Sequence, residues 1–153
     1  TKLVLDTSGE ALHQAARQGV FLIKPSLGEL EGLIGRKLPE LQDQEAAVQE
    51  LIASGAAEIV ALTLGRDGAL LGTRGKCIRI QGIKVVPKSA VGAGDSFLAG
   101  MTLGLSQGRS PEDAFVLGMA AGTAAVLTAG TELCRRADVE RIYHDLKQGS
   151  PEA

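Results

Sequence analysis

Two glycines and an alanine lead into a single carboxylate in the segment Gly92-Ala93-Gly94-Asp95, and an amphipathic helical pattern follows. Small residues let backbone N–H groups approach a ligand closely, and a helix N-terminus adds partial positive charge. A carboxylate beside such an anion hole suits phosphoryl transfer to a hydroxyl, because the carboxylate accepts the proton while the amides hold the phosphoryl charge. A plain helix start with Asp95 in its first turn would explain the same residues.

Two further polar segments follow predicted strands. The first runs from Lys24 through Pro25 and Ser26 to Glu29, and the second is Thr63-Leu64-Gly65-Arg66-Asp67-Gly68. Open α/β sheets bind ligands at the carboxyl ends of their strands, so both segments are candidate binding loops. Each is weak evidence alone, since a Gly-x-x-Gly turn also occurs in hairpins and Glu29 also suits a solvated helix face.

The elements that must position these residues alternate along the first part of the chain. Apolar runs predict strands, and 3.6-residue periodicity predicts helices, in the order strand 2–6, helix 10–18, strand 20–23, helix 27–34, helix 42–53 and strand 59–63. This alternation predicts an α/β fold with parallel strands. A hairpin is expected over 69–71 and 77–80, followed by helices over 93–105, 111–127 and 138–147.

Composition excludes several classes of function. The 153 residues carry a formal net charge of −2, 3% aromatic residues and no tryptophan, so we expect neither nucleic-acid nor membrane binding. The uncharged stretch 114–131 contains Gly118-x-x-x-Gly122, a spacing found in membrane helices, but its small residues and its Ser110-Pro111 start favour a buried helix. Two separated cysteines and no signal peptide indicate a cytoplasmic protein.

Taken together, the motifs resemble the PfkB family of ribokinase-like carbohydrate kinases. The segment Lys88–Met101 matches the second signature of the family, Asp6–Leu12 is similar to a segment of its sugar-phosphate kinases, and Gly130–Cys134 resembles a late segment of its 6-phosphofructokinases. The resemblance implies a three-layer ribokinase-like fold. It covers essentially the whole chain but only the C-terminal half of such a kinase, which predicts a nucleotide-binding half over 1–148 and a disordered tail over 149–153.

The resemblance also implies an activity. It is the ATP-dependent phosphorylation of a sugar phosphate, fructose 6-phosphate to fructose 1,6-bisphosphate, with 1-phosphofructokinase and tagatose-6-phosphate kinase as alternatives. The partners are then ATP and a sugar phosphate, the whole protein is expected to be a homodimer, and this chain alone is expected to be inactive. A non-catalytic nucleotide-binding fragment is the alternative from another class. A dinucleotide-binding fold is disfavoured, since no Gly-x-Gly-x-x-Gly follows a first strand.

Site roles are carried over by motif. Asp95 would be the catalytic base, and the anion hole would consist of the amides of Gly92, Ala93 and Gly94. ATP would contact Lys24, Ser26, Thr63, Leu64, Gly65, Arg66, Asp67, Gly68, Met119 and Thr123. Mg²⁺ would be held through water by Glu29, with Asp6. K⁺ would be held mainly by carbonyls of Ser89, Val91, Ala125, Thr128 and Gly130. One departure is Ser26, where the family pattern has asparagine.

Overall fold

The computed structural model describes residues 1–149. The chain divides into two compact units, which are Thr1–Gly82 (the N-terminal unit) and Ile83–Ala153 (the C-terminal unit). The N-terminal unit contains the whole sheet and three helices, and the C-terminal unit contains three more helices. The two candidate binding loops therefore belong to the first unit, and the Gly92–Asp95 segment belongs to the second.

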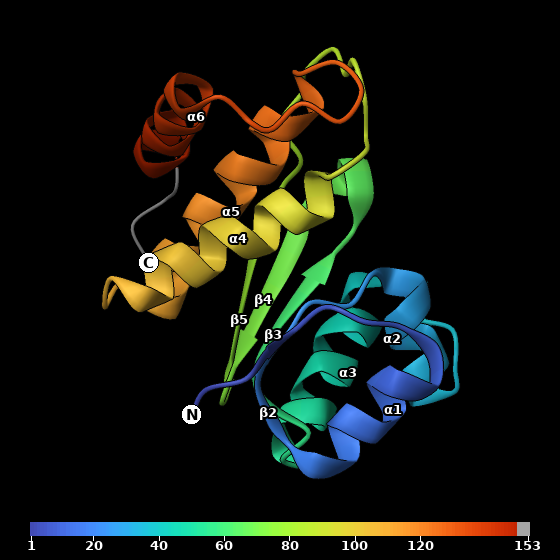
Figure 1. The fold of residues 1–153 in the computed structure, drawn as a ribbon. Coiled ribbons are helices and arrows are strands. Elements are labelled where there is room, and N and C mark those ends of the chain that lie inside the picture. Colours follow the sequence, from blue (N-terminus) through green and yellow to red (C-terminus); the bar gives the residue numbers. More distant parts are fainter. Residues whose placement is uncertain (150–153) are drawn as a thin grey trace. The chain divides into compact units, whose positions relative to one another are not determined.

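A five-stranded sheet forms one layer of the N-terminal unit, with the strand order β1-β2-β3-β4-β5, and Figure 1 labels β2 to β5. Its strands are β1 (Val4–Leu5), β2 (Val20–Ile23), β3 (Ala57–Thr63), β4 (Ala69–Thr73) and β5 (Lys76–Ile80). The pairs β1–β2 and β2–β3 are parallel, whereas β3–β4 and β4–β5 are antiparallel. The predicted parallel strands with an edge hairpin are confirmed, and β3 starts two residues before the predicted strand.

Helices α1 (Gly9–Gln18), α2 (Leu27–Ile34) and α3 (Leu41–Ala53) lie together on one side of this sheet (Figure 1). The apolar face of α3 supplies Val48 and Ile52 to a buried cluster that also contains Leu62 of β3 and Leu70 of β4. Burial of such side chains stabilises the fold by about 1.5–3 kcal/mol each. This packing fixes the carboxyl end of β3, from which the Thr63–Gly68 segment emerges.

Gln49 on α3 holds the turn of the β4–β5 hairpin. Its Nε2 donates to the carbonyl oxygens of Thr73 at 2.9 Å and Lys76 at 3.0 Å, and its Oε1 accepts from the backbone N–H of Gly75 at 3.0 Å. One side chain thereby satisfies three backbone groups that a turn would otherwise leave to water. The hairpin is thus fixed to α3 at its turn as well as through the strand ladder.

The C-terminal unit consists of α4 (Ala93–Ser106), α5 (Pro111–Val126) and α6 (Arg136–Gly149). Helices α4 and α5 pack closely because glycines lie at their contact. A Cβ added to Gly118 would lie 2.7 Å from Met101 Cγ, and one added to Gly100 would lie 2.9 Å from the Leu117 carbonyl oxygen. The uncharged stretch that begins at residue 114 therefore packs against another helix. Across residues 1–149, no helix combines the length and the apolar character that a membrane span requires.

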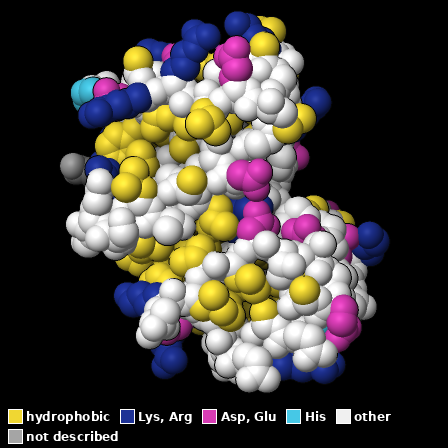
Figure 2. Space-filling model, viewed as in Figure 1, with side chains coloured by type: hydrophobic (Ala, Val, Ile, Leu, Met, Phe, Trp, Pro, Cys, Tyr) yellow, Lys and Arg dark blue, Asp and Glu magenta, His cyan; other side chains and the backbone are white. Residues whose placement is uncertain are grey.

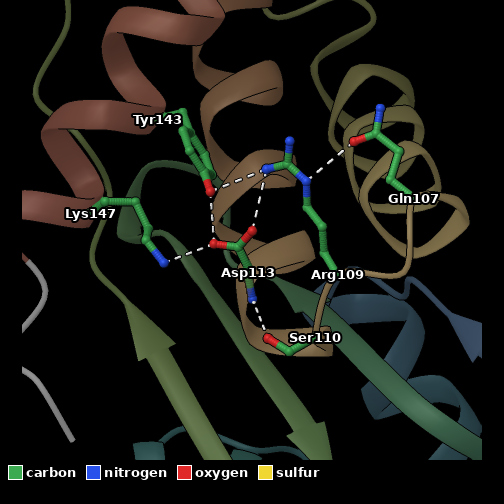
Figure 3. Close-up of polar contacts among 6 residues, drawn as sticks. All are labelled: Gln107, Arg109, Ser110, Asp113, Tyr143 and Lys147. Atoms are coloured by element: carbon green, nitrogen blue, oxygen red, sulfur yellow. Dashed lines mark hydrogen bonds and ion pairs between the residues drawn. The ribbon is translucent and has the colours of Figure 1, made fainter.

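A charged cluster attaches α6 to the start of α5 (Figure 3). The Asp113 carboxylate accepts from Tyr143 Oη at 2.7 Å and from Lys147 Nζ at 2.8 Å, and it pairs with Arg109 Nη1 at 3.3 Å. Partial burial raises the pKa of Asp113, but the hydrogen bonds from Lys147 and Tyr143 outweigh this and leave the pKa below its ordinary value. The cluster therefore favours an ionised Asp113.

Helix α6 begins two residues before the predicted start and extends to Gly149. Asp138, the predicted first residue, lies within the first turn of α6, and the start is marked by the ion pair of Arg136 with Glu140 at 2.7 Å. Of the predicted disordered tail, Gly149 is thus helical, and residues 150–153 lie outside the described residues.

Candidate active site

A pocket of about 320 Å³ lies at the carboxyl end of β3 in the N-terminal unit. Its walls come from both predicted binding loops and from two residues that the motifs did not indicate, and they comprise Ser26, Leu27, Gly28, Gln44, Thr63, Leu64, Gly65, Asp67 and Arg79. The two loops meet because Thr63 donates its N–H to the Pro25 carbonyl at 2.9 Å, and its hydroxyl donates to the same oxygen at 3.3 Å. The structure thus brings together two segments that are 38 residues apart.

The Thr63–Gly68 segment is a tight turn that satisfies its own backbone. A 3₁₀ turn, η1 (Gly65–Asp67), is closed by hydrogen bonds from Leu64 N to the Gly68 carbonyl at 2.9 Å and from Asp67 N to the Leu64 carbonyl at 3.1 Å. Gly68 has φ 101° and ψ −136°, a combination essentially restricted to glycine. Its residue type is therefore required by the backbone of the loop, whatever the loop binds.

Ser26 is the N-cap of α2 and forms a capping box with Glu29. Its Oγ accepts from Glu29 N at 3.3 Å, and Glu29 Oε2 accepts from Ser26 N at 2.7 Å. A parallel bridge between Ser26 and Thr63 directs the Leu27 N–H to the Thr63 carbonyl, and the Gly28 N–H has no acceptor within the described residues. Together with the partial positive charge of the helix, the free Gly28 amide favours an anion in the pocket that it lines. Serine at position 26 thus keeps the capping role that asparagine could also fill.

Lys24, predicted to face nucleotide phosphates, pairs with Asp6 through Nζ and Oδ2 at 3.1 Å. Strands β1 and β2 are parallel with Leu5 opposite Ile23, so the residues that follow them are neighbours. Lys24 is only 7% exposed, and burial of an amine of this kind requires a counter-charge. The first role of Asp6 in this structure is to neutralise Lys24.

The motifs imply a Mg²⁺ site, and its candidate oxygen donors are carboxylates of the N-terminal unit. Among residues 1–149, no three His, Cys, Asp or Glu side chains form a metal-binding group. Glu29 has one carboxylate oxygen in the capping box and one without a protein donor. Mg²⁺ commonly keeps several waters and binds through one or two carboxylates plus substrate phosphates, so this donor set fits a water-mediated role for Glu29.

In the C-terminal unit, Gly92 is the N-cap of α4 with φ 78°, a left-handed conformation that favours glycine. No side chain caps this helix start. The N–H groups of Gly94 and Asp95 have no acceptor within residues 1–149, and the exposed Asp95 carboxylate has no donor there. The segment thus presents the unused donors of Gly94 and Asp95 beside an unused carboxylate, whereas the N–H of Ala93, also predicted for the anion hole, donates to the Ala90 carbonyl at 3.4 Å.

The predicted K⁺ ligands lie in two segments that meet in this unit. Lys88 N donates to the Val126 carbonyl at 2.8 Å, which holds the segment of Ser89 and Val91 near the end of α5. The hydroxyl of Thr128 lies 2.8 Å from the Ala125 carbonyl and 2.9 Å from the Glu132 carbonyl. The Ala125 carbonyl also accepts from the Thr128 N–H at 3.3 Å. A hydroxyl has one proton, so donation to Glu132 leaves a second lone pair of the Ala125 oxygen available for a cation. The carbonyls of Ser89, Val91, Ala125, Thr128 and Gly130 are hard oxygen donors and fit an alkali cation.

Two predicted adenine contacts lie on α5. Thr123 is half-buried, whereas Met119 is 7% exposed and offers little surface to a ligand.

Sequence reasoning missed the pocket residues Gln44 and Arg79. Gln44 is buried with its Oε1 unpartnered, and the exposed Arg79 makes no ion pair with a residue in 1–149. Neither belongs to a motif, and only strand pairing and helix packing bring them to the pocket. Charges of both signs are interspersed over the face in Figure 2.

The sequence profile of the pfkB family carbohydrate kinases matches residues 1–138. This chain belongs to the pfkB family. It is 48% identical to the ATP-dependent 6-phosphofructokinase isozyme 2 of Mycobacterium tuberculosis, over 94% of this chain and 42% of that protein. It is 37% identical to the 1-phosphofructokinase of Borreliella burgdorferi, over 95% of this chain and 47% of that protein. The chain thus spans less than half the length of these curated relatives.

Solved structures give the same family and fold. The phosphofructokinase-2 of Escherichia coli in complex with potassium superposes with a TM-score of 0.92 at 41% identity, over 95% of this chain and 48% of that one. Other structures of that enzyme contain fructose-6-phosphate or show a tetrameric inhibited form, with TM-scores of 0.88 at 39% identity. Arabidopsis thaliana ribokinase, at 24% identity and a TM-score of 0.79, supports the fold alone. The predicted ribokinase-like α/β fold is confirmed.

Proposed function

We propose that this pfkB-family chain is the nucleotide-binding part of an ATP-dependent sugar-phosphate kinase that converts fructose 6-phosphate to fructose 1,6-bisphosphate. The observation that carries the reaction type is the start of α4, where free backbone donors adjoin the unpartnered carboxylate of Asp95. Support for the acceptor comes from the 48% identity to a 6-phosphofructokinase. The 37% identity to a 1-phosphofructokinase makes fructose 1-phosphate the second candidate acceptor.

In the proposed mechanism, Asp95 accepts the proton of the sugar hydroxyl as its oxygen bonds to the γ-phosphorus of ATP, and the bond from that phosphorus to the β,γ-bridging oxygen breaks to release ADP. An alcohol is a weak acid, so the base acts while the bond forms, and such a base contributes about 10²–10⁴-fold to the rate. The amides of Gly92, Ala93 and Gly94 bind the negative charge of the transferring phosphoryl group. Both contributions come from one helix start.

ATP would supply the phosphoryl group when bound, and the pocket supports the contacts proposed for Ser26, Thr63, Leu64, Gly65 and Asp67, which line it. The Thr63–Gly68 loop and the free Gly28 amide at the start of α2 bind the nucleotide in this proposal. Lys24 and Ser26 are the proposed phosphate contacts, and Met119 and Thr123 are the proposed adenine contacts. Glu29, with Asp6, would hold Mg²⁺ through water. The carbonyl groups described for the C-terminal unit hold K⁺, as the potassium complex of the Escherichia coli relative supports.

The proposal extends to the whole protein. We propose that it is a cytoplasmic homodimer and that residues 1–148 act as its nucleotide-binding half. This chain alone then has no phosphofructokinase activity. The tetrameric inhibited form of the Escherichia coli relative makes a tetramer the alternative assembly.

The test is an ATP-coupled assay of the intact protein that contains these residues, with product identification by mass spectrometry. Fructose 6-phosphate, fructose 1-phosphate and tagatose 6-phosphate are compared with and without K⁺. The proposal expects the highest kcat/KM for fructose 6-phosphate and activation by K⁺. Preference for fructose 1-phosphate would instead establish the second candidate, and no ATP-dependent turnover of any sugar phosphate would contradict the proposal.

A further inference from the structure

The residues that follow β5 run against the Thr63–Gly68 loop at backbone contact distance. A Cβ added to Gly82 would overlap the carbonyl oxygen of Arg66 and would lie 3.1 Å from the backbone nitrogen of Gly68. A Cβ added to Gly68 would overlap the Ile80 carbonyl oxygen and would lie 2.6 Å from the backbone nitrogen of Gly82. The two glycines therefore face each other, and the three atoms nearest to each added Cβ are backbone atoms, which cannot rotate away.

The two glycines are required for different reasons. Gly68 has φ 101°, so a side chain there is strained by the backbone conformation as well as by the contact. Gly82 is not among the positive-φ glycines, so its backbone accepts alanine and only the Arg66 carbonyl excludes one. Substitution of Gly82 thus changes the spacing between the two segments with no change in backbone preference.

This spacing matters because the loop has little freedom to adjust. Its internal hydrogen bonds make it a stiff turn, and Thr63 fixes its start to the Pro25 carbonyl. Leu64, Gly65 and Asp67 of the same turn line the pocket. A side chain at position 82 must therefore displace the wall of the pocket, or residues 80–82 must separate from the loop.

We infer that Gly82 is a positioning residue that sets the place of the Thr63–Gly68 loop and thereby the affinity for nucleotide. The inference rests on the proposed function of this loop and adds a residue outside its motif. Gly82 contacts no nucleotide in this account and acts through the Arg66 carbonyl.

The test compares Gly82→Ala with two controls in the intact protein. Gly72→Ala makes the same chemical change in β4, where the added Cβ would overlap the Val48 side chain rather than the loop. Gln81→Ala alters the exposed neighbouring residue. Mg-ATP affinity is measured by calorimetry, KM for ATP and for the sugar phosphate by kinetics, and exchange of the Asp67 and Gly68 amides by hydrogen–deuterium exchange.

For Gly82→Ala we expect ATP affinity to fall at least about tenfold, KM for the sugar phosphate to stay within about twofold, and the two amides to exchange faster. Gly72→Ala lowers the melting temperature but keeps ATP affinity within about twofold. Wild-type ATP affinity and unchanged amide exchange in Gly82→Ala would overturn the inference.

Two outcomes separate this inference from the proposed function. If the wild-type protein does not bind ATP, the proposed function fails, and the amide exchange of Asp67 and Gly68 in Gly82→Ala alone decides whether Gly82 positions the loop. If Gly82→Ala does not fold, hydrogen–deuterium exchange of the wild-type protein on ATP addition tests the inference instead. Protection of amides 66–68 and of residues 82–83 together on ATP addition supports the inference, and protection of 66–68 alone overturns it.

Discussion

Helices α2 and α4 both carry an acidic residue at the third helical position, but they use it differently. In α2, Glu29 reaches back to the Ser26 N–H, and Ser26 Oγ accepts from Glu29 N, so each side chain caps the helix. In α4, the N-cap is Gly92, which has no side chain, and the Asp95 carboxylate makes no hydrogen bond within residues 1–149. The same helical position thus serves structure in one unit and stays available in the other.

The presence or absence of a side-chain cap distinguishes a helix start that stabilises the fold from one that can bind a ligand. A capping box contributes to stability, typically about 1 kcal/mol, and fixes the first turn. An uncapped start with a free carboxylate forgoes that stabilisation and keeps donors and a base for a ligand. We therefore expect changes at Asp95 to affect turnover more than folding, and changes at Ser26 to affect folding more than turnover.

The largest expected effect is on turnover. Asp95→Asn in the intact protein should lower kcat by at least about 100-fold, because an amide cannot accept the proton of the sugar hydroxyl. Steady-state kinetics with saturating ATP measure this. Asp145→Asn, an exposed carboxylate on α6, is the matched control and should leave kcat unchanged. A kcat for Asp95→Asn near the wild-type value would exclude Asp95 as the base.

The next largest expected effect is on the free energy of unfolding. It concerns the cluster around Asp113 and not the two helix starts. Asp113→Ala leaves Tyr143 and Lys147 without their shared acceptor, which we expect to lower the free energy of unfolding by about 1–3 kcal/mol. Urea unfolding measures it. Asp145→Ala removes an exposed ion pair at 3.9 Å and should cost less than about 0.5 kcal/mol. Equal losses in both variants would contradict a specific role for Asp113.

The Asp113 contribution should also depend on pH. Its pKa is lowered in the folded state, so its stabilisation is present above its ordinary pKa near 4 and is lost as the pH falls through the folded value. The hydrogen bond with Asp113 raises the pKa of Lys147, and burial together with Asp113 raises that of Tyr143. Their stabilisation is present below about pH 10 and is lost as the pH rises through the folded values. Unfolding of wild type and Asp113→Ala from pH 3 to 11 should show the largest difference between about pH 5 and 9.

The smallest expected effect is on the capped helix. Ser26→Ala removes the acceptor of the Glu29 N–H and should lower the free energy of unfolding by about 0.5–2 kcal/mol, with a far smaller loss of kcat than Asp95→Asn. Ser26→Asn restores a good N-cap and should recover the stability. Thermal unfolding of the three proteins measures this. If Ser26→Asn does not recover the free energy of unfolding that Ser26→Ala loses, Ser26 acts through something other than the cap.

Much of this structure could be predicted from local sequence patterns. Apolar runs located every strand, and the glycine-rich start located the free helix N-terminus at Asp95. The capping box at Ser26 has its own signature, a serine followed three residues later by glutamate, which family comparison alone treats as a departure. Contacts between distant residues could not be predicted. Asp113 and Tyr143 are 30 residues apart, and Arg79 reaches the pocket only through strand pairing.

The division of roles between the two helix starts is tested most directly by calorimetric titration of Mg-ATP into the intact Asp95→Asn protein. We expect the dissociation constant to stay within about twofold of wild type while turnover falls by at least about 100-fold, because we propose that ATP binds at the Thr63–Gly68 loop and the start of α2. A loss of ATP affinity that matches the loss of turnover would contradict this account.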